Sequence, residues 1–166
     1  MQKNKSSILR KNHLAKLHES LGATNIYWNE MVTPSRYSSN IHLEHLAIRV
    51  NAGLTDMSGI KKAWVSGQDS TEFLNNLVTR DCSKIEPGSA VYTALLDADG
   101  LLIDDAILFR LFPKTTMKNN SDWLICFGGG NGFESLHEAA KNTTVQVKLD
   151  ENLVCSLLQG PKALKL

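Results

Sequence analysis

The sequence predicts an α+β fold with a mainly antiparallel or mixed sheet and helices packed on it. Strand-like and helix-like segments are interleaved along the chain, without the strict βαβ alternation that is typical of a parallel sheet. Two strand-like segments, residues 90–96 and 101–111, flank a turn sequence at residues 97–100, which indicates a β-hairpin. The chain has 166 residues, of which 42% are apolar and 21% charged, and this suits one globular domain.

The charge balance excludes several classes of protein. Lys and Arg number 18 against 17 Asp and Glu, so the net charge of +1 gives no field that would attract nucleic acid or an anionic membrane. No apolar run approaches the roughly 20 residues that a membrane helix needs. We therefore expect neither nucleic acid nor a membrane as a partner.

The cysteines and the N-terminal segment bear on the cellular compartment. Cys82, Cys126 and Cys155 are odd in number and far apart, so we predict buried thiols in a reducing compartment and no zinc site or disulfide framework. Residues 1–16 carry five basic side chains and no acidic one, and they lack the apolar segment of a secretory signal. We expect a cytoplasmic protein, with the mitochondrial matrix as the alternative.

The first third of the chain predicts two helices separated by a loop. Leu14, Leu17 and Leu21 recur at helical spacing, and Gly22 follows as a C-cap. Residues 29–40 are expected to form a loop, because Pro34 lacks a backbone donor and its neighbours are polar. A second helix is predicted over residues 41–51, capped by Ser39 or Asn40. Its expected apolar face consists of Leu43, Leu46, Ala47 and Val50.

The rest of the chain predicts further strands and helices around the hairpin. Strands are expected at residues 60–66, 123–127, 145–149 and 153–158. The sequence from Asp69 to Glu72 resembles a capping box, and Phe73 and Leu74 supply the apolar face of the helix that it begins. A glycine run at residues 128–132 leads into a helix over residues 133–141, and Pro161 begins a last helical turn.

Two neighbouring aspartates stand out in the apolar strand at residues 101–111. Successive strand residues point to opposite faces, so one of Asp104 and Asp105 points to the core. Asp105 shares its face with Ile103, Ile107 and Phe109, and we therefore expect Asp105 to be the inward one. A carboxylate there is costly unless it is paired or hydrogen-bonded, and such sites suit proton or iminium chemistry. The alternative is a structural aspartate that accepts backbone or Arg donors.

The glycine run at residues 128–132 and the five histidines are weaker candidates for a site. Several N–H groups at a helix N-terminus could bind an anion, including that of a nucleotide, but the run lacks the Lys-Ser/Thr of a P-loop and the GxGxxG spacing. The alternative is a tight strand-to-helix turn. His42 and His45 share a helix face, but no third ligand is evident, so we predict no metal site.

Several segments resemble one family when they are taken together. Residues 45–49 and 52–58 resemble the opening "EHxAVR…AGLFDVS" of the glycine-cleavage T-protein, or aminomethyltransferase, family. Residues 65–81 are similar to its "VxGPDAxxFLxxxxTNDV" segment, and residues 87–105 to its "PGxxxYxxxxNxxGGxxDD" hairpin. Residues 158–163 match its "LQGPKA" turn. The motifs follow the family order over most of the chain, which makes coincidence improbable.

The resemblance implies a fold, a cofactor and site residues. Members have a folate-binding α+β core of two lobes followed by a small barrel, and they move aminomethyl or methyl groups onto tetrahydrofolate. The family's key carboxylate corresponds to Asp105, which we assign as catalytic, and a tyrosine of the folate site corresponds to Tyr92. The predicted cofactor-binding residues are Tyr92, Asp105, Asp104, Gly128 and Asn131.

Two departures from the family pattern favour a demethylase-like or methyltransferase-like relative over glycine cleavage proper. Residues 126–131 replace the "VNAAN" segment, and Gly59 stands where the family has a histidine. The expected partner is a small one-carbon donor, or a lipoyl carrier protein if the chain acts in glycine cleavage. The alternative is a non-catalytic relative that serves as a folate-binding or assembly module.

The length predicts an incomplete enzyme, because family members are more than twice as long. We expect an N-terminal helix and loop at residues 1–36 and a folate-binding lobe at residues 37–166, with the second lobe and the barrel missing. The isolated chain is then expected to be inactive, and to associate with itself or with a missing C-terminal half.

Overall fold

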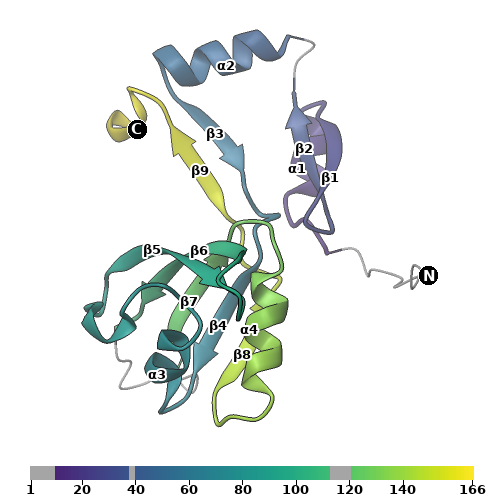
Figure 1. The fold of residues 1–166 in the computed structure, drawn as a ribbon. Helices are drawn as coiled ribbons and strands as arrows, with labels where there is room; N and C mark the ends of the chain where they lie inside the picture. Colours follow the sequence, from purple (N-terminus) through teal and green to yellow (C-terminus); the bar gives the residue numbers. More distant parts are fainter. Residues whose placement is uncertain (1–9, 38–39, 113–120) are drawn as a thin grey trace, which may run out of the picture. The chain divides into compact units, whose positions relative to one another are not determined.

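The computed structural model describes residues 10–37, 40–112 and 121–166, and the chain divides into two compact units. Unit 1 comprises Met1–Gly59 with Glu151–Leu166, and unit 2 comprises Ile60–Asp150. Figure 1 labels the helices and strands of both units. The predicted α+β fold with antiparallel sheets is confirmed, whereas the predicted division between residues 36 and 37 stays a prediction.

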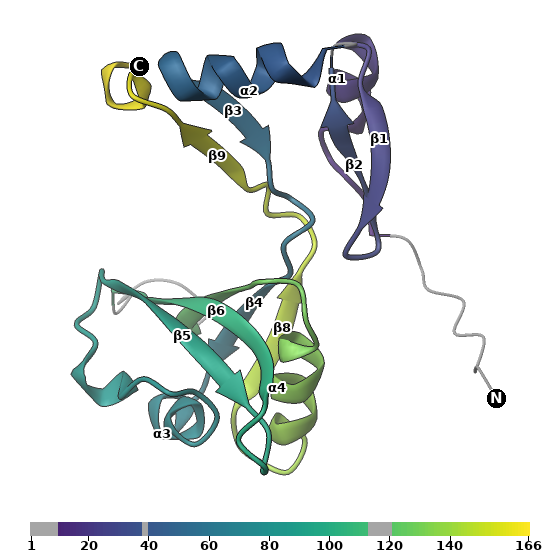
Figure 2. The same ribbon diagram turned by 45° about the horizontal axis from the view of Figure 1, so that its top comes forward.

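Unit 2 is built on an antiparallel sheet of five strands in the order β5-β6-β7-β4-β8. The strands are β4 (Lys62–Ser66), β5 (Ala90–Leu96), β6 (Leu102–Arg110), β7 (Ser121–Phe127) and β8 (Gln146–Asp150). The helices are α3 (Ser70–Asn75), the 3-10 turn η1 (Cys82–Lys84) and α4 (Gly132–Ala140). Figure 2 shows α4 running alongside β8.

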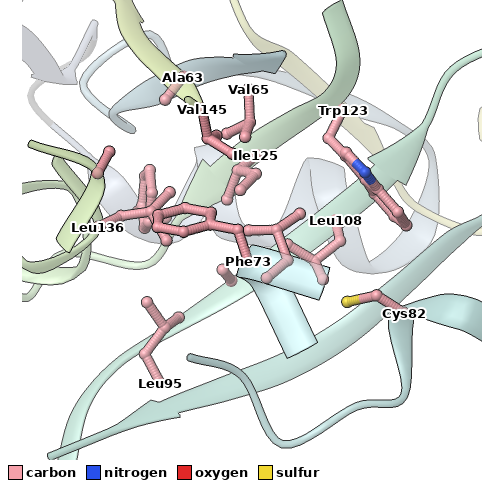
Figure 3. Packing of buried hydrophobic residues seen from close by; sticks show 14 of the residues in the cluster. Ala63, Val65, Phe73, Cys82, Leu95, Leu108, Trp123, Ile125, Leu136 and Val145 are labelled. Carbon is pink, nitrogen blue, oxygen red and sulfur yellow. The ribbon is translucent and has the colours of Figure 1, made fainter. Parts of the chain in front are cut away.

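The core of unit 2 lies between one face of this sheet and the helices α3 and α4. Phe73 and Leu74 from α3 and Leu136 from α4 pack into the same cluster as the inward side chains of the sheet (Figure 3). The sheet contributes Ala63, Val65, Leu95, Ala106, Leu108, Trp123, Ile125 and Phe127. The register explains this composition, because these strand residues alternate along each strand and share one face.

The hairpin predicted from residues 90–111 is present as β5 and β6. Tyr92 pairs with Ile107 and Ala94 pairs with Asp105. In the turn, the Asp97 carboxylate accepts hydrogen bonds from the backbone N–H groups of Asp99 and Leu101, at 3.0 and 2.8 Å. Gly100 has φ +79°, a conformation that favours glycine.

Within its described residues, unit 1 contains two small two-stranded sheets and two α-helices. Strands β1 (Thr24–Trp28) and β2 (Met31–Arg36) form one antiparallel pair, and β3 (Gly53–Asp56) and β9 (Ser156–Gln159) form the other. The helices are α1 (Ala15–Ser20), α2 (Ile41–Val50) and a last 3-10 turn η2 (Ala163–Lys165). Met57 N–H also donates to the carbonyl of Cys155, which extends the β3–β9 pairing.

The expectation of a loop over residues 29–40 is wrong, because β2 and the hairpin turn lie within it. Asn29 and Glu30 both have positive φ, at 47° and 63°, as the central residues of a two-residue type I′ turn require. Pro34 is tolerated because β2 belongs to a sheet of only two strands. Its partner Asn25 lies next to a register irregularity.

Helix α2 agrees with its prediction in position and differs from it in burial. The Asn40 side chain accepts a hydrogen bond from His42 N–H at 3.0 Å and caps the helix, whereas Ser39 lies outside the described residues. The predicted apolar face is not buried, since Leu43, Leu46 and Val50 are all more than half exposed. Helix α1 shows the same feature: its buried residue is His18, and Leu17 is exposed.

Candidate functional site

The β5–β6 hairpin of unit 2 positions the three side chains that the sequence singled out. Asp104 and Asp105 are consecutive on β6, and Tyr92 lies on β5 opposite Ile107. Tyr92 and Asp105 are therefore diagonal neighbours on one face of the sheet, within reach of an aromatic side chain. Asp104 points to the other face, where α3 and α4 pack.

The prediction that Asp105 is the inward aspartate is wrong. Asp104 is 4% exposed and lies in line with Ala106 and Leu108, whereas Asp105 is only partly buried. Strand β6 carries apolar side chains on both faces, so the alternation of residues does not say which face is buried. The buried face is the one that α3 and α4 cover. The costly buried carboxylate exists, one residue earlier than expected.

Backbone donors compensate the burial of Asp104. One carboxylate oxygen, Oδ1, accepts hydrogen bonds from Asp105 N–H at 2.9 Å and Gly129 N–H at 3.2 Å. The other, Oδ2, accepts from Gly132 N–H at 3.1 Å, at the first residue of α4. The glycine run at residues 128–132, which we call the glycine loop, does bind an anion, and that anion is the chain's own Asp104. This explains the run without a nucleotide.

Close approach explains why glycines occupy the loop. A β-carbon at Gly128 would lie 1.9 Å from Asp105 Oδ1, and one at Gly132 would lie 2.8 Å from Asp104 Oδ2. Real β-carbons do not approach other heavy atoms so closely, so side chains at these positions would displace the aspartates. Asn131 is exposed and precedes α4 without a side-chain capping bond.

Asp105 and Tyr92 form the accessible part of the site. The Tyr92 hydroxyl donates to Asp105 Oδ2 at 2.6 Å, and Tyr92 is 61% exposed. The hydrogen bond to Asp105 raises the pKa of Tyr92 above its ordinary value, and burial and the charges of Asp105 and Asp104 act in the same direction. The phenol thus stays protonated at neutral pH and donates, and the carboxylate of Asp105 is left with acceptor capacity toward a ligand.

A second polar cluster, in unit 1, was not anticipated from the sequence. His18 Nε2 lies 2.8 Å from Asp56 Oδ2, and His18 Nδ1 lies 2.8 Å from the Tyr37 hydroxyl. Asn12 donates to the same oxygen of Asp56 at 3.0 Å. Burial would raise the pKa of Asp56, but hydrogen bonds from Ser58, Asn12 and His18 outweigh it, and the pKa lies below its ordinary value.

The cluster could not be found from spacing, because its members are distant in the sequence. A histidine within an apolar helical pattern was its only local signal. These hydrogen bonds join α1 to β3 and to Tyr37, the residue after β2, so the arrangement has a structural role. In the part of the chain that the structure describes, no group of three or more His, Cys, Asp or Glu side chains could hold a metal ion.

The departure from the family pattern at Gly59 has a local explanation. At Gly59, a β-carbon would lie 2.5 Å from the Trp28 ring, so this indole occupies the space that a side chain would need.

The three cysteines are free thiols, with Cys82 buried and Cys126 and Cys155 partly buried. Burial raises the pKa of the Cys82 thiol to about 11, which makes it a poor nucleophile.

Comparison with known proteins decides the family. The model described as the GCVT N-terminal domain matches residues 14–166. The chain belongs to this family. The resemblance to aminomethyltransferases seen in the sequence is thereby confirmed.

The relatives include both aminomethyltransferases and a demethylase subunit. The heme-dependent oxidative N-demethylase gamma subunit of Ectopseudomonas mendocina is 40% identical, over 95% of this chain and 39% of that protein. An aminomethyltransferase of Corynebacterium aurimucosum is 33% identical, over 90% of this chain and 39% of that protein.

A solved structure shows the same relation. The crystal structure of glycine cleavage system aminomethyltransferase T from Bartonella henselae matches with a TM-score of 0.79 and 31% identity, over 93% of this chain and 42% of that one. The chain thus spans about two fifths of the length of the proteins that it matches. None of the helices within the described ranges is long and apolar enough to cross a membrane.

Proposed function

We propose that the chain binds tetrahydrofolate at the β5–β6 hairpin and forms the N-terminal part of an enzyme that transfers a one-carbon unit to it. The observation that carries this proposal is the pair of Asp105 and Tyr92, hydrogen-bonded at 2.6 Å on the accessible face of the hairpin. Membership of the GCVT N-terminal domain family supports the assignment of folate as the ligand.

The residues present fit such a ligand. Tyr92 offers an exposed aromatic ring, against which a flat heterocycle can pack. Asp105 offers a carboxylate beside it that can accept hydrogen bonds. Tetrahydrofolate supplies a nitrogen that takes up the one-carbon unit, and cationic character develops near it during transfer. In this proposal the ionised Asp105 carboxylate stabilises that charge and steers the proton transfer. Tyr92 holds the carboxylate in place by its hydrogen bond.

The same reasoning extends to the one-carbon donor. We infer an N-methyl donor rather than an aminomethyl group on a lipoyl carrier protein. Gly59 and the glycine loop both replace residues of the aminomethyltransferase pattern, and the demethylase subunit is more similar to this chain than the aminomethyltransferase above. A second candidate is a non-catalytic folate-binding or assembly module, which the same two replacements favour. It predicts no turnover of any one-carbon donor by the complete protein.

Titration of tetrahydrofolate against the chain tests the binding proposal. Asp105→Asn removes the charge and is expected to weaken binding about tenfold or more, as the loss of a hydrogen bond to a charged group does. Tyr92→Phe is expected to weaken it less, because the ring is retained. Asp99→Asn is the matched control, since it removes the same charge from the exposed turn of the same hairpin. Equal affinity of the wild type and Asp105→Asn would refute the role of Asp105.

A further inference from the structure

We propose that Asp104 is a positioning residue. Its buried carboxylate holds the glycine loop in place by hydrogen bonds, and the loop in turn sets where the Asp105 carboxylate lies relative to Tyr92. The inference rests on the proposed function of Asp105 and names the residue on which that function depends. It gives Asp104 a role that involves no contact with a ligand, in place of the cofactor contact predicted from the sequence.

Energetics point to this role. A carboxylate that is 4% exposed is costly to bury unless hydrogen-bond donors surround it. Here the donors are the N–H groups of Asp105, Gly129 and Gly132, so each contact fixes a piece of backbone around the site. The N-terminus of α4 is occupied by this internal anion. The same bonds that compensate burial therefore also hold the loop in one place.

Contacts of the glycine loop couple Asp104 to Asp105. Gly128 N–H donates to the backbone carbonyl of Asp105 at 2.8 Å, and the Asp105 carboxylate lies where a β-carbon of residue 128 would be. The loop is thus packed against Asp105 at Oδ1, whereas Oδ2 accepts the hydrogen bond from Tyr92. If Asp104 releases Gly129 and Gly132, Asp105 loses that packing and can leave its hydrogen bond to Tyr92.

Two variants separate positioning from a loss of charge. Asp104→Asn removes the charge and leaves one acceptor oxygen for three donors. Gly132→Ala keeps both carboxylates charged but places a methyl group 2.8 Å from Asp104 Oδ2, which forces that carboxylate to move. The charge of Asp104 itself contributes to the raised pKa of Tyr92, so Asp104→Asn lowers that pKa even if Asp104 only stabilises the fold. Gly132→Ala then leaves the pKa of Tyr92 unchanged. If Asp104 positions Asp105, Gly132→Ala lowers it as well.

The experiment follows two signals by NMR in the folded chain without any ligand. The first is hydrogen exchange at the amides of Gly129 and Gly132, which is expected to become about tenfold faster or more in Asp104→Asn. The second is the titration of the Tyr92 ring, assigned with Tyr92→Phe. Its pKa is expected to fall toward that of Asp105→Asn in both Asp104→Asn and Gly132→Ala, because the hydrogen bond to Asp105 is lost.

Asp99→Asn again serves as the control and should change neither signal. Faster exchange at the two glycines with a Tyr92 titration that is unchanged in Gly132→Ala would overturn the positioning role, because the loop would then be independent of Asp105. Should Asp104→Asn fail to fold, Gly132→Ala decides alone by the same criterion. If the Tyr92 titration shifts as expected while tetrahydrofolate binds to no variant and not to the wild type, positioning is supported and the folate proposal alone fails.

Discussion

The two units of this chain are stabilised by different kinds of contact. In unit 2, apolar side chains from α3, α4 and the sheet form one cluster (Figure 3). In unit 1, among the residues that the structure describes, Met31 is the one buried apolar side chain. The buried polar or charged side chains of unit 1 are Arg10, Asn12, His18, Thr33 and Ser58.

This difference has consequences for how each unit responds to change. Apolar burial is non-directional and depends on area and packing, so it tolerates many small changes and fails when volume is removed. Buried polar groups depend on particular partners, and each lost partner leaves a donor or acceptor unsatisfied. The apolar core of unit 2 can therefore tolerate a buried carboxylate such as that of Asp104. Unit 1 depends on its polar hydrogen bonds for its stability.

The largest effect is expected from emptying the core of unit 2. Leu108→Ala removes a fully buried side chain from the centre of β6 and should lower the free energy of unfolding by about 2–5 kcal/mol. Denaturant unfolding measures this change in the free energy of unfolding. Leu54→Ala on β3 is the control, because Leu54 is 68% exposed and its loss should cost about 0.5 kcal/mol or less. Similar costs for the two variants would contradict the contrast between the units.

A smaller and local effect is expected from the polar cluster of unit 1. In the wild type, Asp56 Oδ2 bonds with His18 and Asn12, and Asp56 Oδ1 accepts from Ser58 N–H. Asp56→Asn leaves one acceptor oxygen for these bonds and should cost roughly 1–3 kcal/mol. Hydrogen exchange should accelerate at amides of unit 1, such as Ser58 and Gly22, and remain slow in β6 and β7. Uniform acceleration in both units would show that they unfold together and that the cluster has no local role.

The smallest effect is a pH dependence that the same residue confers on unit 1. The pKa of Asp56 lies below the ordinary 3.8, so the folded state binds its proton less readily than the unfolded chain does. The stabilisation by this carboxylate is complete above the ordinary pKa and is lost as the pH falls through the lower, folded value. Hydrogen exchange in unit 1 at decreasing pH should therefore show a loss of protection that Asp56→Asn lacks. The same loss in both proteins would contradict this assignment.

Local signals in the sequence were sufficient for most of unit 2. Residues 97–100 combine an Asx turn with a glycine of positive φ, and this chemistry is legible without tertiary context. The glycine run before α4 was likewise predicted, as was the capped helix α2 of unit 1. The hairpin turn at Asn29 and Glu30 was missed because neither is glycine, and Pro34 suggested a loop.

The orientation of the two aspartates could not be obtained in the same way. Residues 103, 105, 107 and 109 are as apolar a set as residues 104, 106 and 108, so the pattern of β6 does not say which face the helices cover. That choice is made by α3 and α4, which are distant in the sequence. The cluster of His18, Asp56 and Tyr37 was missed for the same reason, since three elements must meet before its chemistry is visible.

The central claim, that the Asp105–Tyr92 pair of unit 2 is where the ligand binds, is tested most directly by following the whole chain by NMR while tetrahydrofolate is added. We expect saturable shifts at the Tyr92 ring and at the backbone of Asp105, with the tyrosine of the unit 1 cluster, Tyr37, unaffected. Shifts confined to unit 1, or saturable binding that leaves Tyr92 and Asp105 unchanged, would contradict the claim.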